Sequence, residues 1–144
     1  MVDVSGKEVT RRRAVAVATI KMKKAAFESL LRRGSPKGDV FETARIAGIM
    51  AAKATPVLIP HCHSLNIEKV TVAFEILKAR ASIRVAAEVV CTGKTGVEME
   101  ALAAATTACL TIYDMMKWAG QEMVISDVKL LHKSGGRSGV INRK

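Results

Sequence analysis

The stretch CTGKTGVEMEALAAATTACLTIYDMMK, residues Cys91–Lys117, decides how the chain folds. After a glycine-punctuated turn it runs for about two dozen residues without Gly or Pro, and the helix-favouring Ala, Leu, Met and Glu dominate it. The composition therefore predicts one long helix. Its core-facing side is predicted from residues that recur at three- and four-residue steps, namely Met99, Leu102, Ala103, Thr106, Cys109, Leu110, Tyr113 and Met116.

The two ends of this helix carry charged side chains that the core-facing side does not need. Glu98 and Glu100 lie at its start, and Asp114 and Lys117 lie at its end. At the rise of an α-helix, Glu98 and Asp114 are separated by about 24 Å. The ends therefore belong to two sites, or a neighbouring subunit brings its opposite end alongside. The structural alternative is that the glutamates complement the positive helix start and that Asp114 and Lys117 form a surface pair.

The bulk composition predicts one domain with an anionic partner. A hydrophobic content of 49% in 144 residues fits a single domain, residues 1–144, with a core of its own. The formal net charge of +10 favours nucleic acid, a phosphorylated small molecule or an acidic surface as partner. Proteins that read RNA or single strands usually stack bases on aromatic side chains, and the aromatic content is only 3%. A triphosphate-bearing small molecule therefore fits better than a polymer.

Other features of the composition bear on compartment and on metal binding. No apolar run approaches the ~18 residues of a membrane span, and the N-terminus has no signal-peptide pattern, so we expect a cytoplasmic protein with no membrane partner. Cys62, Cys91 and Cys109 are odd in number and lack paired CxxC spacing. Neither a disulfide framework nor a zinc knuckle is indicated.

The order of elements predicts the fold class. The pattern reads strand, two helices, strand, strand, helix, strand, which indicates an α+β fold of the ferredoxin-like split β-α-β type, with a four-stranded antiparallel sheet and helices packed on one face. The other face would be free for self-association. In chain order, the expected segments are an irregular arm (1–10), a solvated arginine triplet (11–13), a strand (14–22), a helix (23–33), a helix capped by Asp39 and ended by Thr55-Pro56, strands over 70–76 and 83–89, the long helix ending at Gly120, a strand (123–131) and a basic glycine-rich tail (134–144).

Four short motifs carry possible chemistry. Gly93-Lys94-Thr95 imitates a P-loop, but Glu88 occupies the place of the required first glycine, which excludes that motif. The imidazoles of His61-Cys62-His63 could converge, yet a fourth ligand at metal spacing is missing, so a polar pocket lining is favoured over zinc. Lys37 at a helix start and Lys133-Ser134-Gly135-Gly136-Arg137 could hold phosphate. The alternatives are an exposed loop lysine and a solvated tail.

Four long motifs resemble a known family. They are KGDVFETARIAGIMAAK (37–53), LIPHCHSL (58–65), TGKTGVEMEALAAATTACLTIYDMMK (92–117) and LLHKSGGRSG (130–139), and the opening MVDVSGK matches as well. Together they look like the cyclic pyranopterin monophosphate synthases, the C protein of molybdenum cofactor biosynthesis. The resemblance covers nearly the whole chain.

The resemblance implies a lyase, and we expect it to have no resident metal or cofactor. Its substrate would be (8S)-3′,8-cyclo-7,8-dihydroguanosine 5′-triphosphate, and its products cyclic pyranopterin monophosphate and diphosphate. It also implies a homohexamer, a trimer of dimers, with active sites at subunit interfaces. By resemblance, the catalytic residues would be Asp114, Lys117, Lys37 and Lys133, and the substrate-binding residues His61, Cys62, His63, Glu98 and Met99.

Two positions depart from the family pattern. Ser64 stands where the family usually has proline, and His61 replaces a usually apolar residue. Both departures could re-aim the loop that carries His63. The alternative function is a basic, oligomeric RNA-binding module of the same sheet topology, although Ile83–Cys91 contains none of the stacking aromatics that such modules use.

Overall fold

The structure is a computed structural model that describes residues 1–137 and 139–143. It is an α+β fold of three helices and a five-stranded sheet. The elements are β1 (Thr10–Lys21), α1 (Lys24–Arg33), α2 (Val40–Leu58), β2 (Ile67–Leu77), the short 3-10 turn η1 (Lys78–Arg80), β3 (Ser82–Gly93), α3 (Glu98–Met116), β4 (Val124–Ser134) and β5 (Ile141–Asn142). In the described part of the chain, no helix is long and apolar enough to cross a membrane.

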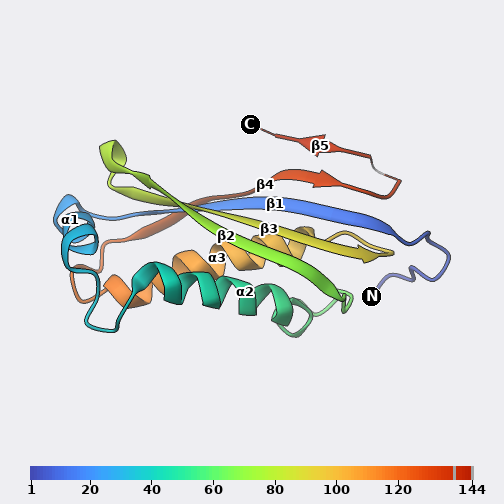
Figure 1. Ribbon diagram of the computed structural model, residues 1–144, viewed down its shortest axis with the longest axis horizontal. Coiled ribbons are helices and arrows are strands. Elements are labelled where there is room, and N and C mark those ends of the chain that lie inside the picture. The colour runs from blue at the N-terminus through green and yellow to red at the C-terminus, as the bar shows by residue number, and fades with distance from the viewer. Residues whose placement is uncertain (138, 144) are drawn as a thin grey trace.

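The strands lie in the order β2-β3-β1-β4-β5, and each neighbouring pair is antiparallel (Figure 1). The predicted count of four strands is therefore wrong by one. β5 comes from the segment predicted as a tail (134–144), of which Ser138 and Lys144 lie outside the described residues. Gly135, Gly136 and Gly139 adopt positive φ angles, which allows the chain to reverse so that Ile141 pairs with Lys133.

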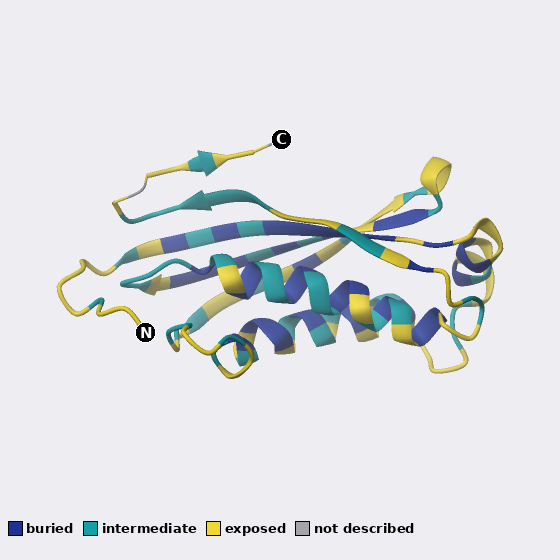
Figure 2. Cartoon of the chain, turned by 180° about the vertical axis from the view of Figure 1, so that it is seen from behind, coloured by how far each residue is buried: buried dark blue, intermediate teal, exposed yellow. Residues whose placement is uncertain are grey.

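Both long helices cover one face of the sheet, and the core lies between them and the strands (Figures 1 and 2). The inward positions of β1 are the small side chains Ala14, Ala16 and Ala18, followed by Ile20, and all four are buried. Small residues let the helices approach the sheet closely, which favours dense packing between the layers. α1 stands apart at one end of the sheet, where Phe27 and Leu30 anchor it.

α3 buries only part of the face that the sequence predicts. Met99 and Leu110 are exposed, whereas Cys109 and Met116 are buried together with Glu100, Ala101, Ala104, Ala105, Ala108, Ile112 and Met115. The sequence pattern favoured the larger apolar residues. Close packing against the alanines of β1 selects the small ones instead, and Met99 and Leu110 are left uncovered within one chain.

Two further segments differ from expectation. α2 does not end at Thr55-Pro56 but continues to Leu58, because a proline near the helix end removes only one hydrogen bond and Ile59 N still donates to Thr55 O at 2.9 Å. The triplet Arg11–Arg13 is not a solvated edge. It lies in β1, a central strand, and Arg12 is buried on the same face as Ala14.

Gly48 lies where α2 packs closely against α3 and β2, and we expect Gly48→Leu to destabilise the fold. A Cβ at this position would lie 3.0 Å from Ala104 O and 3.1 Å from Val72 Cγ2, so a leucine cannot be accommodated without moving a helix. Overpacking of this kind costs about 1–3 kcal/mol, and occasionally more. Urea unfolding monitored by circular dichroism measures the loss. Gly6→Leu is the control, because nothing lies within 4 Å of a Cβ at Gly6, and equal stability of the two variants would contradict this account of the packing.

Candidate functional site

The end of α3 holds a cluster of one carboxylate between two ammonium groups. Asp114 Oδ2 lies 2.6 Å from Lys37 Nζ, and Asp114 Oδ1 lies 2.8 Å from Lys117 Nζ. The three side chains are each about half exposed. The sequence placed Lys37 some eighty residues before the other two, and the structure brings all three together. We call Lys37, Asp114 and Lys117 the carboxylate cluster.

A short turn before α2 positions Lys37. Ser35 Oγ donates to Met115 O at 2.7 Å and accepts from Lys37 N, which fastens the turn to the last residues of α3. Gly38 has a φ of 111°, a conformation that side chains disfavour, so the KGD motif needs its glycine. Asp39 then caps α2 by accepting from Glu42 N, as predicted. Glu42 does not complete a capping box, because its side chain pairs with Arg45.

The charges of the carboxylate cluster shift one another's titration. Hydrogen bonds from Lys117 and Lys37 lower the pKa of Asp114 from 3.8 to about 2, and the contact with Asp114 raises the pKa of Lys117. In the isolated chain Asp114 is therefore a carboxylate at neutral pH. The arrangement holds a fixed dipole and two cations at a surface that an anionic ligand could reach.

We expect Asp114 to titrate near pH 2 in the intact chain and closer to 3.8 in a Lys37→Gln, Lys117→Gln double variant. Because the folded pKa lies below the unfolded value, the pairing contributes stability above pH 3.8 and loses it as pH falls toward 2. Carbon-detected NMR of the Asp114 carboxyl follows the titration. A midpoint that stays the same when both lysines are removed would contradict the assigned cause.

The other end of α3 faces a cavity of about 430 Å³. Lys133 Nζ lies 2.8 Å from Glu98 Oε1, and both side chains are about three-quarters buried. Lys133 stands opposite Ala14 in the pairing of β4 with β1 and therefore shares the inward face of the sheet with Arg12. We call this the glycine-loop cavity. Its lining includes Arg12, Arg13, Lys94, Thr95, Gly96, Glu98, Lys133, Gly135, Gly136 and Arg137.

The glycines of this cavity have no room for a side chain. Gly135 has a φ of 96° and lies against the backbone of Arg11, and Gly136 has a φ of 75° and lies against the Arg12 guanidinium. A Cβ on Gly96 would overlap the Glu98 carboxylate. Arg12 is 8% exposed and is fixed by donation from its Nε to Gly93 O at 3.2 Å. The loops therefore wrap closely around cations and a carboxylate.

The segment His61-Cys62-His63 lies beside this cavity, under the N-terminal arm. His63 Nε2 is 2.8 Å from Val2 O, and His61 Nδ1 is 3.2 Å from the Met1 amino group. Lys7 and Thr95 line both the glycine-loop cavity and the hollow that contains the two histidines. Each imidazole has its own partner on the arm. Within the residues that the structure describes, no group of three or more His, Cys, Asp or Glu is arranged to hold a metal ion.

Glu100 is a functional candidate that the sequence reasoning left out of the site. It is 1% exposed, its Oε1 accepts from Cys62 Sγ at 3.7 Å, and its Oε2 has no hydrogen-bond partner among the described residues. Burial raises its pKa, and it also raises that of the Cys62 thiol. The sequence did contain an indication of its burial, because Glu100 lies one helical turn before Ala104 on the buried face. Arg12 was missed as well, although it alternates with Ala14 and Ala16.

The predicted site residues thus fall into two groups at opposite ends of one helix. Lys37, Asp114 and Lys117 form one, and Lys133, Glu98 and the Cys62 segment form the other, with Met99 exposed beside them. About 24 Å of helix separates them. The molecule is an α+β protein that presents cations and carboxyl groups in two separate clusters at the ends of α3, which we call the two half-sites.

Comparisons with known proteins show the family to which this chain belongs. The sequence model of the MoaC family matches residues 1–136. Similar proteins named cyclic pyranopterin monophosphate synthase occur in Pelotomaculum thermopropionicum (54% identical, covering 100% of this chain and 85% of the relative), Magnetococcus marinus (53%, covering 96% and 85%) and Desulfovibrio desulfuricans (49%, covering 99% and 87%). The chain belongs to the MoaC family. The alternative of an RNA-binding module finds no support in these comparisons.

Proposed function

We propose that the chain is a lyase of molybdenum cofactor biosynthesis that converts (8S)-3′,8-cyclo-7,8-dihydroguanosine 5′-triphosphate to cyclic pyranopterin monophosphate and diphosphate. The names of relatives that are about half identical over the whole chain support this reaction. The observation that carries it to particular residues is the grouping of Lys37, Asp114 and Lys117 within hydrogen-bond distance at one end of α3. A cytoplasmic location and one domain over residues 1–144 are part of the proposal.

The glycine-loop cavity is assigned the triphosphate. Lys133, Arg12 and Arg137 line it, and its glycines let backbone N–H groups approach an anion. Charge-assisted hydrogen bonds from such cations offset the charge of the substrate and of the departing diphosphate. Glu98 holds Lys133 in place. His61, Cys62, His63 and Met99 are assigned to the base and sugar, together with the buried carboxyl of Glu100.

The carboxylate cluster is assigned the proton transfers. A general base works best when its pKa lies near the operating pH, and an Asp114 pKa of about 2 is far from that. Burial of the cluster against a second subunit and the substrate would raise the pKa of Asp114 and lower that of Lys117. The groups titrate together, so the acid and base roles belong to the cluster rather than to one residue.

A second copy of the chain is assigned the role of joining the two half-sites. Exposed apolar side chains follow the outer faces of the two long helices, with Ile46 and Met50 one turn apart on α2 and Leu110 on α3. A two-fold interface that sets α3 beside its antiparallel copy brings Asp114 of each chain toward Lys133 of the other. Three such dimers form the proposed homohexamer. We further assign the four long strands with α2 and α3 to a ferredoxin-like core, extended by β5.

The direct test is incubation of the purified chain with the upstream cyclised nucleotide. We expect diphosphate and cyclic pyranopterin monophosphate in equal amounts, detected by phosphate-coupled assay and by mass spectrometry. Phosphate release without the pterin would overturn the proposed reaction. The RNA alternative is tested in parallel by titration with a single-stranded RNA, for which only weak, salt-sensitive binding is expected.

A further inference from the structure

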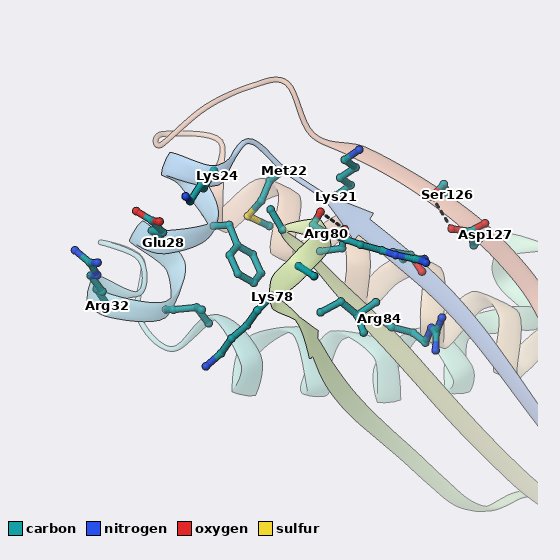
Figure 3. A pocket seen from close by; sticks show the side chains of 17 residues that line it. Lys21, Met22, Lys24, Glu28, Arg32, Lys78, Arg80, Arg84, Ser126 and Asp127 are labelled. Carbon is teal, nitrogen blue, oxygen red and sulfur yellow. Dashed lines mark hydrogen bonds between the residues drawn. The ribbon is translucent and has the colours of Figure 1, made fainter.

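A large hollow on this surface lies away from both half-sites, at the α1 end of the sheet. It has a volume of about 1180 Å³ and opens between α1, η1 and the ends of β1 and β3 (Figure 3). None of the residues that line it belongs to the carboxylate cluster or the glycine-loop cavity. We call it the α1 pocket.

The α1 pocket combines an apolar wall with cations from several elements. Phe27 and Leu31 of α1 and Leu77 at the end of β2 supply apolar surface. The cations are Lys21 from β1, Lys24 and Arg32 from α1, Lys78 and Arg80 from η1 and Arg84 from β3, and the acids are Glu28 and Asp127. Arg84 pairs with Glu75, but over the described residues neither Lys78 nor Arg80 forms an ion pair. A concentration of unpaired like charge is unfavourable unless an anion offsets it.

The backbone around the pocket is irregular in three places. Ala81 and Asp127, both in its lining, are the two non-glycine residues with positive φ in the described part of the chain, at 45° and 52°. The pairing of β1 with β4 also slips between Val17 and Thr19, opposite Ser126. Strained residues and bulges cluster at binding sites, where they aim side chains that regular strands could not.

The strained turn is held firmly. Ala81 N donates to Lys78 O, Ala81 O accepts from Met22 N at 3.0 Å, and Ser82 Oγ donates to Arg80 O at 2.9 Å. These bonds fix η1, and with it Lys78 and Arg80, against the end of β1 that carries Lys21. The cations are therefore presented from a fixed scaffold rather than from a loose loop, which lowers the entropy lost when an anion is bound.

We propose that the α1 pocket is a second ligand site, which binds a multiply phosphorylated small molecule independently of the reaction. Arginine and lysine side chains recognise phosphate through charge-assisted hydrogen bonds. The concave shape and the apolar wall suit a small molecule better than the flat surface of a macromolecule. The site stands whether or not the proposed reaction is correct, because no residue of either half-site takes part in it.

Methyl NMR separates the α1 pocket from the glycine-loop cavity. Met22 lines the pocket, whereas Met99 lies next to Glu98 at the start of α3. The chain is labelled at its methionine methyl groups, Met22 is assigned with Met22→Leu, and inorganic tripolyphosphate is titrated in. We expect the Met22 signal to shift to saturation, with an affinity that falls about tenfold or more in Lys78→Gln, Arg80→Gln. An unshifted Met22 signal would overturn the proposal.

The matched control is the double variant Lys53→Gln, Arg33→Gln. It also removes one lysine and one arginine charge, but from exposed positions outside the pocket. It should leave the Met22 titration unchanged, and an equal loss of affinity would mean that only bulk charge attracts the anion, against the proposal. Circular dichroism checks that each variant is folded. Light scattering is run alongside. If the pocket variants change the oligomeric state and Met22 does not respond to tripolyphosphate, the pocket is an interface between copies and the proposal is wrong.

Discussion

Asp114→Asn is expected to reduce turnover of the cyclised dihydro-GTP by about 10²–10⁴-fold, the usual effect of removing a positioned proton carrier. The asparagine keeps the shape of the side chain but cannot carry the proton, and it leaves Lys37 and Lys117 without the carboxylate that both contact. The side chain is half exposed, so the loss of stability should be small. Single-turnover kinetics at saturating substrate measures the change in kcat.

Glu75→Gln is the matched control for this variant. Glu75 is also an exposed carboxylate in an ion pair, with Arg84 on the neighbouring strand, but it is a residue of β2 and belongs to neither half-site. It should retain wild-type turnover. If Asp114→Asn turned over as fast as Glu75→Gln, the carboxylate cluster would not be the proton-transfer site.

Lys133→Ala is expected to lower kcat/KM by about 10–100-fold, chiefly through KM, because one charge-assisted contact to the triphosphate is lost. The effect should exceed that of a surface lysine because Lys133 is largely buried, 2.8 Å from Glu98. Its removal also leaves the Glu98 carboxylate facing the phosphates. Steady-state kinetics over a range of substrate concentrations separates KM from kcat.

Two further variants serve as controls for that result, Lys133→Arg and Lys53→Ala. The arginine retains the charge and should recover part of the loss. Lys53 is an exposed lysine on α2, so its removal should leave KM unchanged. If Lys133→Ala had the wild-type KM, the assignment of the triphosphate to the glycine-loop cavity would be wrong.

Much of the architecture could be predicted from the sequence because the patterns were local. The alternation in 70–76 and 83–89, the cap at Asp39 and the composition of the long helix each indicated an element that the structure contains. The predictions were wrong where tertiary packing, rather than local sequence, determines the structure. The alanine-rich face of α3 is buried because β1 offers alanines against it, and no pattern within α3 alone reveals this. β5 depends on a pairing across a glycine turn, which has no periodicity of its own.

Most residues of the candidate site could be predicted from the sequence, but which of them lie together in space could not. Lys37 meets Asp114 only because Ser35 ties the turn before α2 to the end of α3. The sequence analysis missed Arg12 and Glu100, because charged side chains are rarely buried and are normally predicted to be exposed. In both cases the inward position was readable from neighbouring alanines, and burial of a charge there points to a site.

The claim on which the account depends is that one active site takes the carboxylate cluster from one chain and the glycine-loop cavity from another. The most direct measurement is activity after co-expression of Asp114→Asn and Lys133→Ala chains, purified together through different tags. Random pairing makes about one quarter of the sites fully wild type, so about a quarter of the wild-type activity, measured as kcat/KM at low substrate concentration, should return. Activity no higher than that of the two variants assayed separately would contradict a shared site.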